Sequence, residues 1–325
     1  MATMNAAVYY QYGSPEVIRV EELPKPVPKD QEILIRVYAT TVNRTDCARL
    51  RADPFIMRFF TGLIKPINPI LGTDFAGVVE AIGKSVIKFK IGDKVFGLND
   101  QGMSSQAEYM VCGNEKFVSH MPKNASFQQA AASAEGAHYA INFINKVRLE
   151  KNQRAFVNGA SGAIGSAMVQ LLKYHGLHVT ATCSHKNLGL VASLGVDNVI
   201  DYENQDFLAI GETFDFVLDA VGKSTFGECK TLLNPAGIYI SSELGPKNQN
   251  PFLALVTPLT GGKQVKFPFP HDIKASLALI KMMMEEGKFE PLIDREYPLA
   301  DIANAYAYVE TGQKTGNVII NLSLK

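Results

Sequence analysis

Hydrophobic and polar residues alternate in short segments along the first part of the chain. Residues 33–38 and 76–81 are two such segments, and the turns between segments of this kind are rich in Pro, Gly and Asp. A period of two is typical of strands that bury one face. The pattern therefore predicts that roughly the first 120 residues are mostly β-structure.

The pattern becomes helical at Ser126, where Gln129 follows at the spacing of a capping box, and it stays helical to about residue 147. Strands and helices then alternate, and after a predicted loop near residues 245–263 a last strand leads into a helix. The sequence predicts strands at 154–158, 178–183, 198–201, 214–219, 236–241 and 264–268, and helices at 163–175, 187–194, 224–233 and 272–286. This alternation predicts an α/β fold with a doubly wound parallel sheet.

The turn after the strand at 154–158 has the composition of a dinucleotide-binding turn. It reads Ala160-x-Gly162-x-x-Gly165 and opens an amphipathic helix. Gly162 lacks a Cβ, so a phosphate can approach the backbone, and Gly165 lets the helix pack against the strand. The start of the helix offers free N–H groups to an anion. The strand at 178–183 follows at βαβ spacing, so the segment predicts a bound dinucleotide.

Length, composition and charge narrow the class of protein. The chain has 325 residues, of which 46% are hydrophobic and 20% charged, which is typical of a globular protein with two domains. Lys and Arg together number 32, as do Asp and Glu, so the net charge is zero. This balance argues against nucleic acid or an anionic membrane as the main partner. No apolar run approaches the ~20 residues of a membrane span.

The cysteines and the N-terminal segment bear on the expected compartment. Cys47, Cys112, Cys183 and Cys229 are scattered, with no Cys-x-x-Cys pair, which favours reduced thiols. The N-terminal residues lack a charged and then apolar leader. We therefore expect a cytoplasmic protein.

The chain resembles the medium-chain dehydrogenase/reductase superfamily, and most closely its zinc-independent quinone oxidoreductase and enone reductase branch. Beside the dinucleotide turn, the resemblance rests on residues 72–83, 89–97, 286–299 and 312–320 and covers essentially the whole chain. It implies a Gro-ES-like catalytic domain formed by residues 1–124 and 265–325, and a Rossmann domain formed by residues 125–264. It also implies a homodimer joined near residues 236–243.

The resemblance implies a site without metal. Zinc-using relatives hold their catalytic metal with Cys, His and Cys, and the matching positions here are Asn43, Thr73 and Glu135. An amide and a hydroxyl are poor zinc ligands compared with thiolate and imidazole. The closely spaced cysteines of the structural zinc loop are also missing.

The end of the second strand of the dinucleotide-binding domain favours NADPH as the cofactor. An NAD-preferring domain carries an acid there, whereas this chain has Ser184 and Lys186. A hydroxyl and an ammonium group attract a 2′-phosphate. In NADPH-using relatives a basic residue and a later Tyr contact that phosphate, and Lys186 and Tyr202 match them. The resemblance places the cofactor against Arg44, Glu135, His138, Gly159, Ala160, Ser161, Gly162, Ala163, Ile164, Gly165, Ser184, Lys186, Tyr202, Ala220, Val221, Gly222, Ser241, Ser242 and Asn317.

The expected reaction is hydride transfer from NADPH to a small-molecule conjugated enone, enal or quinone. Such substrates spread the developing charge, so side-chain donors can stabilise it without a metal. The resemblance places Asn43, Thr45 and Tyr109 at the cleft as donors, with Asp46 orienting them. Loops near residues 46–66, 98–106 and 243–262 are expected to surround the substrate, with Phe55, Phe59, Phe60 and Phe252 as candidate walls.

Two alternatives stay open. Arg44-Thr45-Asp46 is similar to the alcohol dehydrogenase pattern, in which the hydroxyl relays a proton and the Arg reaches the pyrophosphate. His138 also replaces a small hydroxyl residue. A metal-free, NADP-dependent alcohol dehydrogenase or ketone reductase that uses Thr45 and His138 is therefore the first alternative. The second is an NADPH-binding regulatory protein without turnover.

Overall fold

A computed structural model of the chain describes residues 2–100, 104–113, 115–269 and 272–324; residues 101–103 of the predicted substrate loop lie outside these ranges. The chain divides into two compact units, Met1–Glu135 with Ile273–Lys325, and Gly136–Asp272. The sequence placed the boundaries at 124 and 264. The first boundary lies later because helix α3 (Phe127–Ala132) packs on strands of the first unit. The second lies later because strand β13 (Gln264–Lys266) pairs within the second unit.

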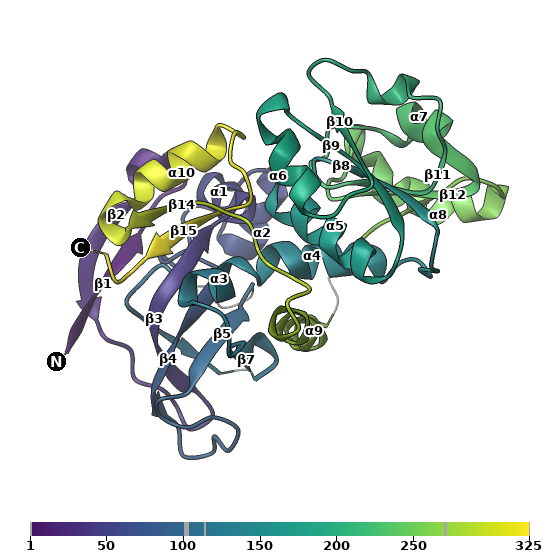
Figure 1. Cartoon of the computed structure of the whole chain (residues 1–325). Coiled ribbons are helices and arrows are strands. Elements are labelled where there is room, and N and C mark those ends of the chain that lie inside the picture. The colour runs from purple at the N-terminus through teal and green to yellow at the C-terminus, as the bar shows by residue number, and fades with distance from the viewer. Residues whose placement is uncertain (1, 101–103, 114, 270–271, 325) are drawn as a thin grey trace. The chain divides into compact units, whose positions relative to one another are not determined.

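The first unit is built on a seven-stranded sheet (Figure 1). The order is β14-β15-β3-β4-β5-β7, and β6 also pairs with β3. The β14–β15 pair is parallel, and the other pairs are antiparallel. The strands are β3 (Ile33–Val42), β4 (Asp74–Ile82), β5 (Lys94–Leu98), β6 (Tyr109–Cys112), β7 (Val118–His120), β14 (Ile293–Pro298) and β15 (Asn317–Asn321). Strands β1 (Thr3–Val8) and β2 (Arg19–Pro24) form a separate antiparallel pair.

The helices of the first unit pack on these strands. Helices α1 (Arg44–Arg51) and α10 (Ile302–Glu310) contact one another and share a core with β3 and β15. Leu50, Tyr306 and Val318 are fully buried in that core. The other helices are α2 (Arg58–Thr61) and α9 (Ile273–Glu285), and α4 (Glu135–Ile144) begins at the last residue of the segment Met1–Glu135. This core fixes the end of β3, where the polar residues of the candidate site begin.

The second unit is a six-stranded parallel sheet in the order β10-β9-β8-β11-β12-β13 (Figure 1). In chain order this is 3-2-1-4-5-6, the order of dinucleotide-binding sheets. The strands are β8 (Arg154–Asn158), β9 (His178–Cys183), β10 (Asn198–Asp201), β11 (Phe214–Asp219), β12 (Leu233–Ser241) and β13, and the helices are α5 (Ala163–Tyr174), α6 (Leu188–Ser193), α7 (Phe226–Cys229) and α8 (Gln249–Thr260). The predicted α/β class, with a Gro-ES-like sheet and a Rossmann-type parallel sheet, is confirmed.

Two helical segments differ from the sequence prediction. The helical stretch 126–147 is two helices, because the chain breaks at Ser133, whose hydroxyl donates to Ala130 O at 2.8 Å. The Ser126–Gln129 capping box forms as predicted. The predicted helix 224–233 is shorter, because β12 begins at Leu233.

The predicted loop at 245–263 is wrong, since most of it is helix α8. Glycines near both ends of the segment, and Pro258 inside it, favoured the prediction of a loop. Pro251 does not oppose the helix, because it lies in the first turn, where proline is tolerated. Tertiary contacts stabilise the helix. Leu253 packs on the core of the parallel sheet, and the Thr257 hydroxyl accepts a hydrogen bond from Val265 N at 2.9 Å.

Two expectations about the chain as a whole can be compared with the structure. All four cysteines are free and buried. In the part of the chain that the structure describes, no helix combines the length and hydropathy needed to cross a bilayer.

Candidate functional site

The first group of candidate residues lies where β3 ends and α1 begins. Asn43 is the N-cap of α1, and its backbone N–H donates to Asp46 Oδ2 at 2.8 Å. A side chain at the third helical position that reaches back to the N-cap is one half of a capping box. Asp46 is fully buried by this arrangement, whereas Thr45 keeps some exposure. The run from Asn43 to Asp46 is therefore a helix start that sets the directions of its own side chains.

Three polar side chains converge on Glu135, the first residue of α4. Thr45 Oγ1 donates to Glu135 Oε1 at 2.6 Å, and Thr73 Oγ1 donates to Glu135 Oε2 at 2.5 Å. Asn43 Nδ2 lies 3.3 Å from the same Oε2. We call these four residues the Glu135 cluster. All four belong to the first unit, and they come from the start of α1, the residue before β4 and the start of α4.

The Glu135 cluster includes the positions that match zinc ligands in zinc-using relatives. Asn43, Thr73 and Glu135 do meet in space, but the amide and the hydroxyl donate hydrogen bonds to the carboxylate. A carboxylate that accepts these bonds is satisfied by protein donors, as buried polar groups generally are. Over the described ranges, no group of three His, Cys, Asp or Glu side chains is arranged to hold a metal ion.

Two further carboxyl groups lie beside the Glu135 cluster. Asp74 Oδ2 accepts hydrogen bonds from Thr41 Oγ1 at 2.9 Å and from Asn43 Nδ2 at 3.0 Å. Burial, and then the charge of Glu135, raise the pKa of Asp74 well above its ordinary value. The same two causes raise the pKa of Asp46 to about 7. Asp74 and Thr41 were not among the predicted site residues, although Asp74 follows Thr73 directly.

Lys314 is a cation near this acidic group that the sequence analysis also missed. Burial lowers its pKa to about 8, while the charges of Glu135 and Asp294 act in the opposite direction. Its ammonium group donates to Gly316 O at 2.6 Å. The sequence offers one signal that could have drawn attention to Lys314, because it lies in the segment 312–320, which carries part of the family resemblance.

The structure places Tyr109 away from the Glu135 cluster. It lies on β6 opposite Arg36 of β3, and Lys25 Nζ sits 3.7 Å from the centre of its ring. Thr41 is five residues further along β3, which corresponds to ~17 Å of strand. Tyr109 packs instead against the small core near β1 and β2.

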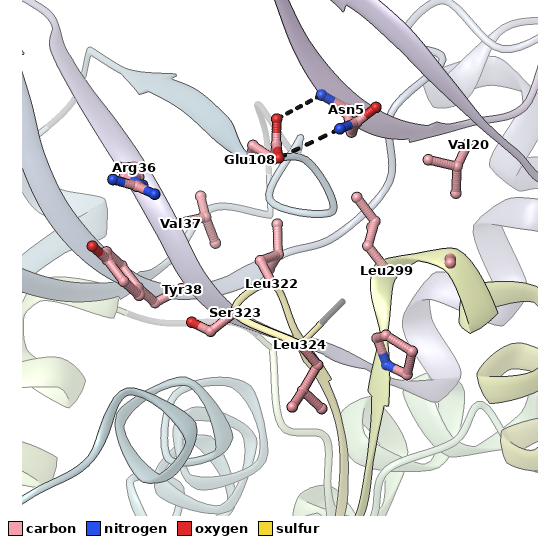
Figure 2. Close-up of a pocket in the computed structure, with 12 residues that line it drawn as sticks. Asn5, Val20, Arg36, Val37, Tyr38, Glu108, Leu299, Leu322, Ser323 and Leu324 are labelled. Carbon is pink, nitrogen blue, oxygen red and sulfur yellow. Dashed lines mark hydrogen bonds between the residues drawn. The ribbon is translucent and has the colours of Figure 1, made fainter.

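A cavity of about 700 Å³ in the first unit is a different feature (Figure 2). Arg36, Tyr38 and Leu322 are among its walls, and Glu108 accepts hydrogen bonds from the backbone and side chain of Asn5 there. Of the described residues that line this cavity, none belongs to the Glu135 cluster.

The dinucleotide turn of the second unit has the geometry that its glycines require. Gly159 has a φ of +85°, and a Cβ there would lie 2.4 Å from Val221 Cγ1. A Cβ at Gly165 would lie 2.1 Å from Gly159 O, so this glycine allows α5 to pack against the turn. At Gly162 the nearest atom to a Cβ is Gly159 O at 3.7 Å, an ordinary contact. The protein therefore needs glycine at 159 and 165, and the space beside Gly162 is left for a ligand.

The start of α5 suits the pyrophosphate of a dinucleotide. Gly162 is its N-cap and has no side chain to satisfy the N–H groups of the first turn. These groups have no partner within the helix and carry the positive end of its dipole. Ser161, Ala163 and Ile164 thus lie at a helix start, a place where proteins commonly bind anions.

A buried polar network holds the loops around this turn. Thr182 Oγ1 donates to Asn158 Oδ1 at 2.7 Å and accepts from Gly159 N at 2.9 Å. Asn158 Nδ2 donates to Asp219 Oδ1 at 3.2 Å, and Asp219 also accepts from the N–H groups of Val221 and Gly222. The network ties together the carboxyl ends of β8, β9 and β11. The sequence analysis missed it, because its members stand as single polar residues at strand ends.

The expected phosphate contacts lie at the end of β9. Ser184 is buried and accepts a hydrogen bond from Asn187 Nδ2 at 3.1 Å, while Lys186 and Tyr202 are exposed. Acids from the end of β10 do lie nearby. Asp201 Oδ2 is 2.7 Å from His185 Nδ1, and the His185 N–H donates to Glu203 at 2.9 Å. The imidazole and the backbone of His185 therefore engage both acids.

The remaining candidate residues are distributed over both units. In the second unit, Ser241 is buried at the end of β12, and Ser242 N donates to Asp219 O at 3.0 Å. His138 is buried on α4, with Asn142 Nδ2 3.2 Å from its Nε2. In the first unit, Arg44 is exposed at the first position of α1. Asn317 of the first unit is buried and donates to Leu292 O at 3.0 Å. Ala160 and Ala220 of the second unit lie in the loops that follow β8 and β11.

Comparison with known proteins agrees with this architecture. Residues 29–141 match the alcohol dehydrogenase GroES-like domain family, and residues 194–320 match the zinc-binding dehydrogenase family. The chain is 31% identical to 2-methylene-furan-3-one reductase of Solanum lycopersicum, over 98% of this chain and 79% of that protein. It is also 31% identical to quinone-oxidoreductase QR1, chloroplastic, of Triphysaria versicolor, over 98% of each.

Further similarities extend to another relative and to a solved structure. The chain is 29% identical to NADPH-dependent alkenal/one oxidoreductase, chloroplastic, of Arabidopsis thaliana, over 98% of this chain and 79% of that protein. The structure of the quinone oxidoreductase from Coxiella burnetii superposes with a TM-score of 0.88 at 25% identity, covering 99% of this chain and 100% of that one.

A Gro-ES-like sheet domain joined to a dinucleotide-binding parallel sheet defines an alcohol dehydrogenase-like oxidoreductase fold. The chain belongs to the medium-chain dehydrogenase/reductase superfamily, in its zinc-independent quinone oxidoreductase branch.

Proposed function

We propose that this protein is an NADPH-dependent oxidoreductase that transfers hydride to a conjugated enone, enal or quinone without a metal. The observation that carries the proposal is the Glu135 cluster. The amide of Asn43, the hydroxyl of Thr73 and the carboxylate of Glu135, which match zinc ligands in relatives, are joined by hydrogen bonds, and the Thr45 hydroxyl donates to the same carboxylate. The printed names of the relatives, a furanone reductase, a quinone oxidoreductase and an alkenal/one oxidoreductase, support this substrate class.

The residues present fit a bound nicotinamide dinucleotide. The space at Gly162, the free N–H groups at the start of α5 and the loops held by Asp219 suit its pyrophosphate. When bound, NADPH supplies the hydride. The chain itself must then stabilise negative charge on the substrate oxygen, and one proton must be added, so that the conjugated double bond gains two hydrogens in all.

We assign the stabilisation of the substrate oxygen to the Glu135 cluster, and the proton comes from solvent. Thr45 is the member with some exposure, and its hydroxyl, which donates to Glu135 at 2.6 Å, must turn from Glu135 to donate to the substrate oxygen. Asn43 is buried and bonds Thr41, Asp74 and Glu135, which suits a group that holds the others in place. Asp46 holds the helix start. Delocalised charge in an enolate or quinol anion needs less stabilisation than a localised alkoxide, so these donors suffice for activated substrates.

The test is a screen of NADPH oxidation over quinones, enals, enones and saturated ketones of similar size. We expect conjugated substrates to react much faster than saturated ketones. The same preparation should keep its activity after chelation and contain no stoichiometric zinc. One tightly bound zinc ion per chain, with activity lost on its removal, would overturn the metal-free site.

The first alternative, a metal-free NADP-dependent alcohol dehydrogenase or ketone reductase, is favoured by one observation. The short Thr45–Glu135 hydrogen bond is a route by which a hydroxyl could relay a proton to a carbonyl oxygen. A preference for saturated ketones in the screen would support this alternative. The second alternative, an NADPH-binding regulatory protein, predicts cofactor binding without turnover of any substrate in the panel.

We propose NADPH over NADH because Ser184 and Lys186 stand at the end of β9, where NAD-binding domains carry an acid. The acids Asp201 and Glu203 are engaged by His185, which lessens their repulsion of a 2′-phosphate. The named NADPH dependence of the alkenal/one oxidoreductase relative is consistent with this choice.

We also propose a homodimer in the cytoplasm, joined differently from the sequence-based expectation. Residues 238–240 of β12 are paired on both sides, with β11 and β13, so that stretch cannot form an edge-to-edge junction. The edge strand next to β12 is β13, and Phe252, Leu255 and Leu259 of the neighbouring helix α8 are exposed. Light scattering of the wild type and of Leu255→Asp tests this surface. A wild-type monomer would overturn the dimer.

The free, buried cysteines suit the reducing compartment that we propose, the cytoplasm.

A further inference from the structure

An exposed apolar segment in the first unit takes no part in the hydrogen bonds of the Glu135 cluster. It spans residues 54–69 and includes a 3₁₀ turn (Phe55–Met57) and helix α2. Phe60, Ile64 and Ile67 are 77%, 89% and 79% exposed, and Phe55 and Phe59 are also exposed. Exposed apolar residues that are scattered singly are ordinary, but a contiguous group of this kind marks an interaction surface.

The segment is held in place by polar contacts behind it. Tyr12 OH donates to Gly62 O at 2.7 Å and lies 2.8 Å from Thr61 Oγ1. Ile67 N donates to Thr61 O at 2.8 Å. The Arg58 guanidinium lies over the rings of Tyr12 and Phe55, at 5.0 and 5.5 Å from their centres. These bonds hold the backbone of the segment in place, and its apolar side chains are exposed to solvent.

The charge of the segment is one-sided. Between Pro54 and Thr73 the chain contains Arg58 and Lys65 and no acidic residue. Lys65 is exposed, and among the described contacts no hydrogen bond or ion pair involves its ammonium group. The zero net charge of the whole chain, which argued against a membrane partner, conceals this local distribution. Phenylalanine and isoleucine side chains beside lysine and arginine are the combination found where proteins bind anionic bilayer surfaces.

We propose that residues 54–69 dock this protein on the surface of an anionic phospholipid bilayer, with Phe60 and Ile64 entering the headgroup and acyl boundary. Lys65, which is exposed, then faces the lipid phosphates. Such docking would place the protein next to quinones and enones that partition into lipid. Binding to the bilayer itself does not depend on turnover, so it is tested separately from the proposed reaction.

The chain contains no tryptophan, which allows a probe at one position. Phe60→Trp places a single indole on the segment, and Ile87→Trp places one on an unrelated isoleucine that is 94% exposed. With vesicles of phosphatidylcholine and phosphatidylglycerol, we expect a blue shift and quenching by brominated lipid for Phe60→Trp only. Equal behaviour of the two probes, or no shift in either, would overturn the proposal.

Sedimentation with the same vesicles measures the affinity of the unlabelled chain. Phe60→Asp with Ile64→Asp should lower the partition coefficient by more than about tenfold, since burial of each side chain would be lost. Ile87→Asp should leave it unchanged. Lys65→Glu should weaken binding to anionic vesicles and not to phosphatidylcholine alone. All these positions are exposed, so circular dichroism and thermal melting should match the wild type.

Two other occupants of the segment predict different results. If it contacts a second copy of the chain, Phe60→Asp with Ile64→Asp changes the mass in solution and the wild type does not bind vesicles. If it is only a wall of the substrate site, the same variant changes the KM for a small water-soluble enone and vesicles are again not bound. Either result overturns the membrane proposal.

Discussion

Thr73 donates a 2.5 Å hydrogen bond to Glu135, across 62 positions of sequence. In zinc-using relatives the residues at these two positions bind a metal, whereas here they form a hydrogen bond with each other. The hydroxyl precedes strand β4 and the carboxylate is the first residue of helix α4, and both residues belong to the first unit. Because Thr45 and Asn43 donate to the same carboxylate, Glu135 organises the proposed catalytic group.

Replacing Glu135 tests this organisation. Glu135→Gln keeps the size of the side chain but cannot accept at both ends, so the bonds from Asn43, Thr45 and Thr73 cannot all be kept and the whole cluster is disturbed. We expect kcat/KM for an enone to fall about ten- to hundredfold, the range for losing hydrogen bonds to a charged group. Glu80→Gln, which changes a glutamate paired with Lys25 elsewhere in the unit, is the control. Full activity of Glu135→Gln would remove Glu135 from the mechanism.

Thr45→Val separates the two enzymatic functions. An enone spreads its negative charge, so its reduction should fall less than about tenfold when one hydroxyl is removed. A saturated ketone requires a proton at a localised alkoxide, and its reduction should fall by ~10²–10³. Steady-state rates with both substrates measure the difference, and Thr311→Val, at an exposed hydroxyl after α10, serves as the control. If the wild type prefers ketones and Thr45→Val abolishes that activity, the alcohol dehydrogenase alternative replaces our proposal.

We expect Gly162 of the dinucleotide turn to matter for ligand binding and Gly165 to matter for packing of the fold. A Cβ at position 162 meets only an ordinary contact, so Gly162→Ala should change the free energy of unfolding by less than about 1 kcal/mol, within the range of N-cap effects. It should still weaken NADPH binding at least tenfold. Gly165→Ala would place a Cβ 2.1 Å from Gly159 O and should destabilise the fold. Calorimetric titration and urea unfolding measure the two effects, and unchanged NADPH affinity in Gly162→Ala would contradict the pyrophosphate assignment.

Lys186 should account for much of the preference for NADPH. Charge-assisted contacts to one phosphate are worth ~1–3 kcal/mol, so NADPH should bind about ten- to hundredfold more tightly than NADH. Lys186→Ala should reduce that ratio by weakening NADPH alone. Lys151 is exposed before the amino end of β8, and Lys151→Ala should leave both affinities unchanged. Equal wild-type affinities for the two cofactors would refute the assignment.

The buried acids predict how stability depends on pH. The unfolded chain releases the Asp46 proton near the ordinary value of 3.8, whereas the folded chain keeps it until about 7. Between these values the folded state binds more protons, so the free energy of unfolding should decrease as pH rises. Asp74, whose pKa is also raised, acts in the same direction. Urea unfolding at about pH 5 and about pH 7 should show this slope, and Asp46→Asn should flatten it.

The pH range of the unfolding experiment should stay below pH 8. Above that value Lys314 makes the free energy of unfolding increase with pH, which is the opposite slope. Its pKa is lowered to about 8 from an ordinary 10.5, so over that interval the unfolded chain binds more protons. Burial lowers the pKa of His175 and adds a rise in stability with pH over part of this range, so the Asp46→Asn variant is the reference. A wild-type slope between about pH 5 and about pH 7 that is no more negative than that of Asp46→Asn would contradict the assignment to Asp46.

The sequence by itself determined the parallel sheet and its dinucleotide turn. Strands 154–158, 178–183, 198–201 and 214–219 form with the predicted bounds, because each is a short segment with β-branched or aromatic residues between turn residues and needs no distant partner to be recognised. The Ser126–Gln129 cap and the glycines at 162 and 165 were equally local signals. Helix α8 was not predicted, because packing of Leu253 and Thr257 outweighs the prolines and glycines around it.

Only the tertiary structure decided how the polar residues are combined. Asn43, Thr45, Thr73 and Glu135 lie up to 92 positions apart, and their shared hydrogen bonds depend on the packing of β3, β4 and α4. The same holds for the Asn158–Thr182–Asp219 network, for the acids engaged by His185, and for the outward direction of the residues at 54–69. Hydrophobic periodicity reports which face of an element is buried, whereas a hydrogen bond between distant side chains requires both elements to be in place.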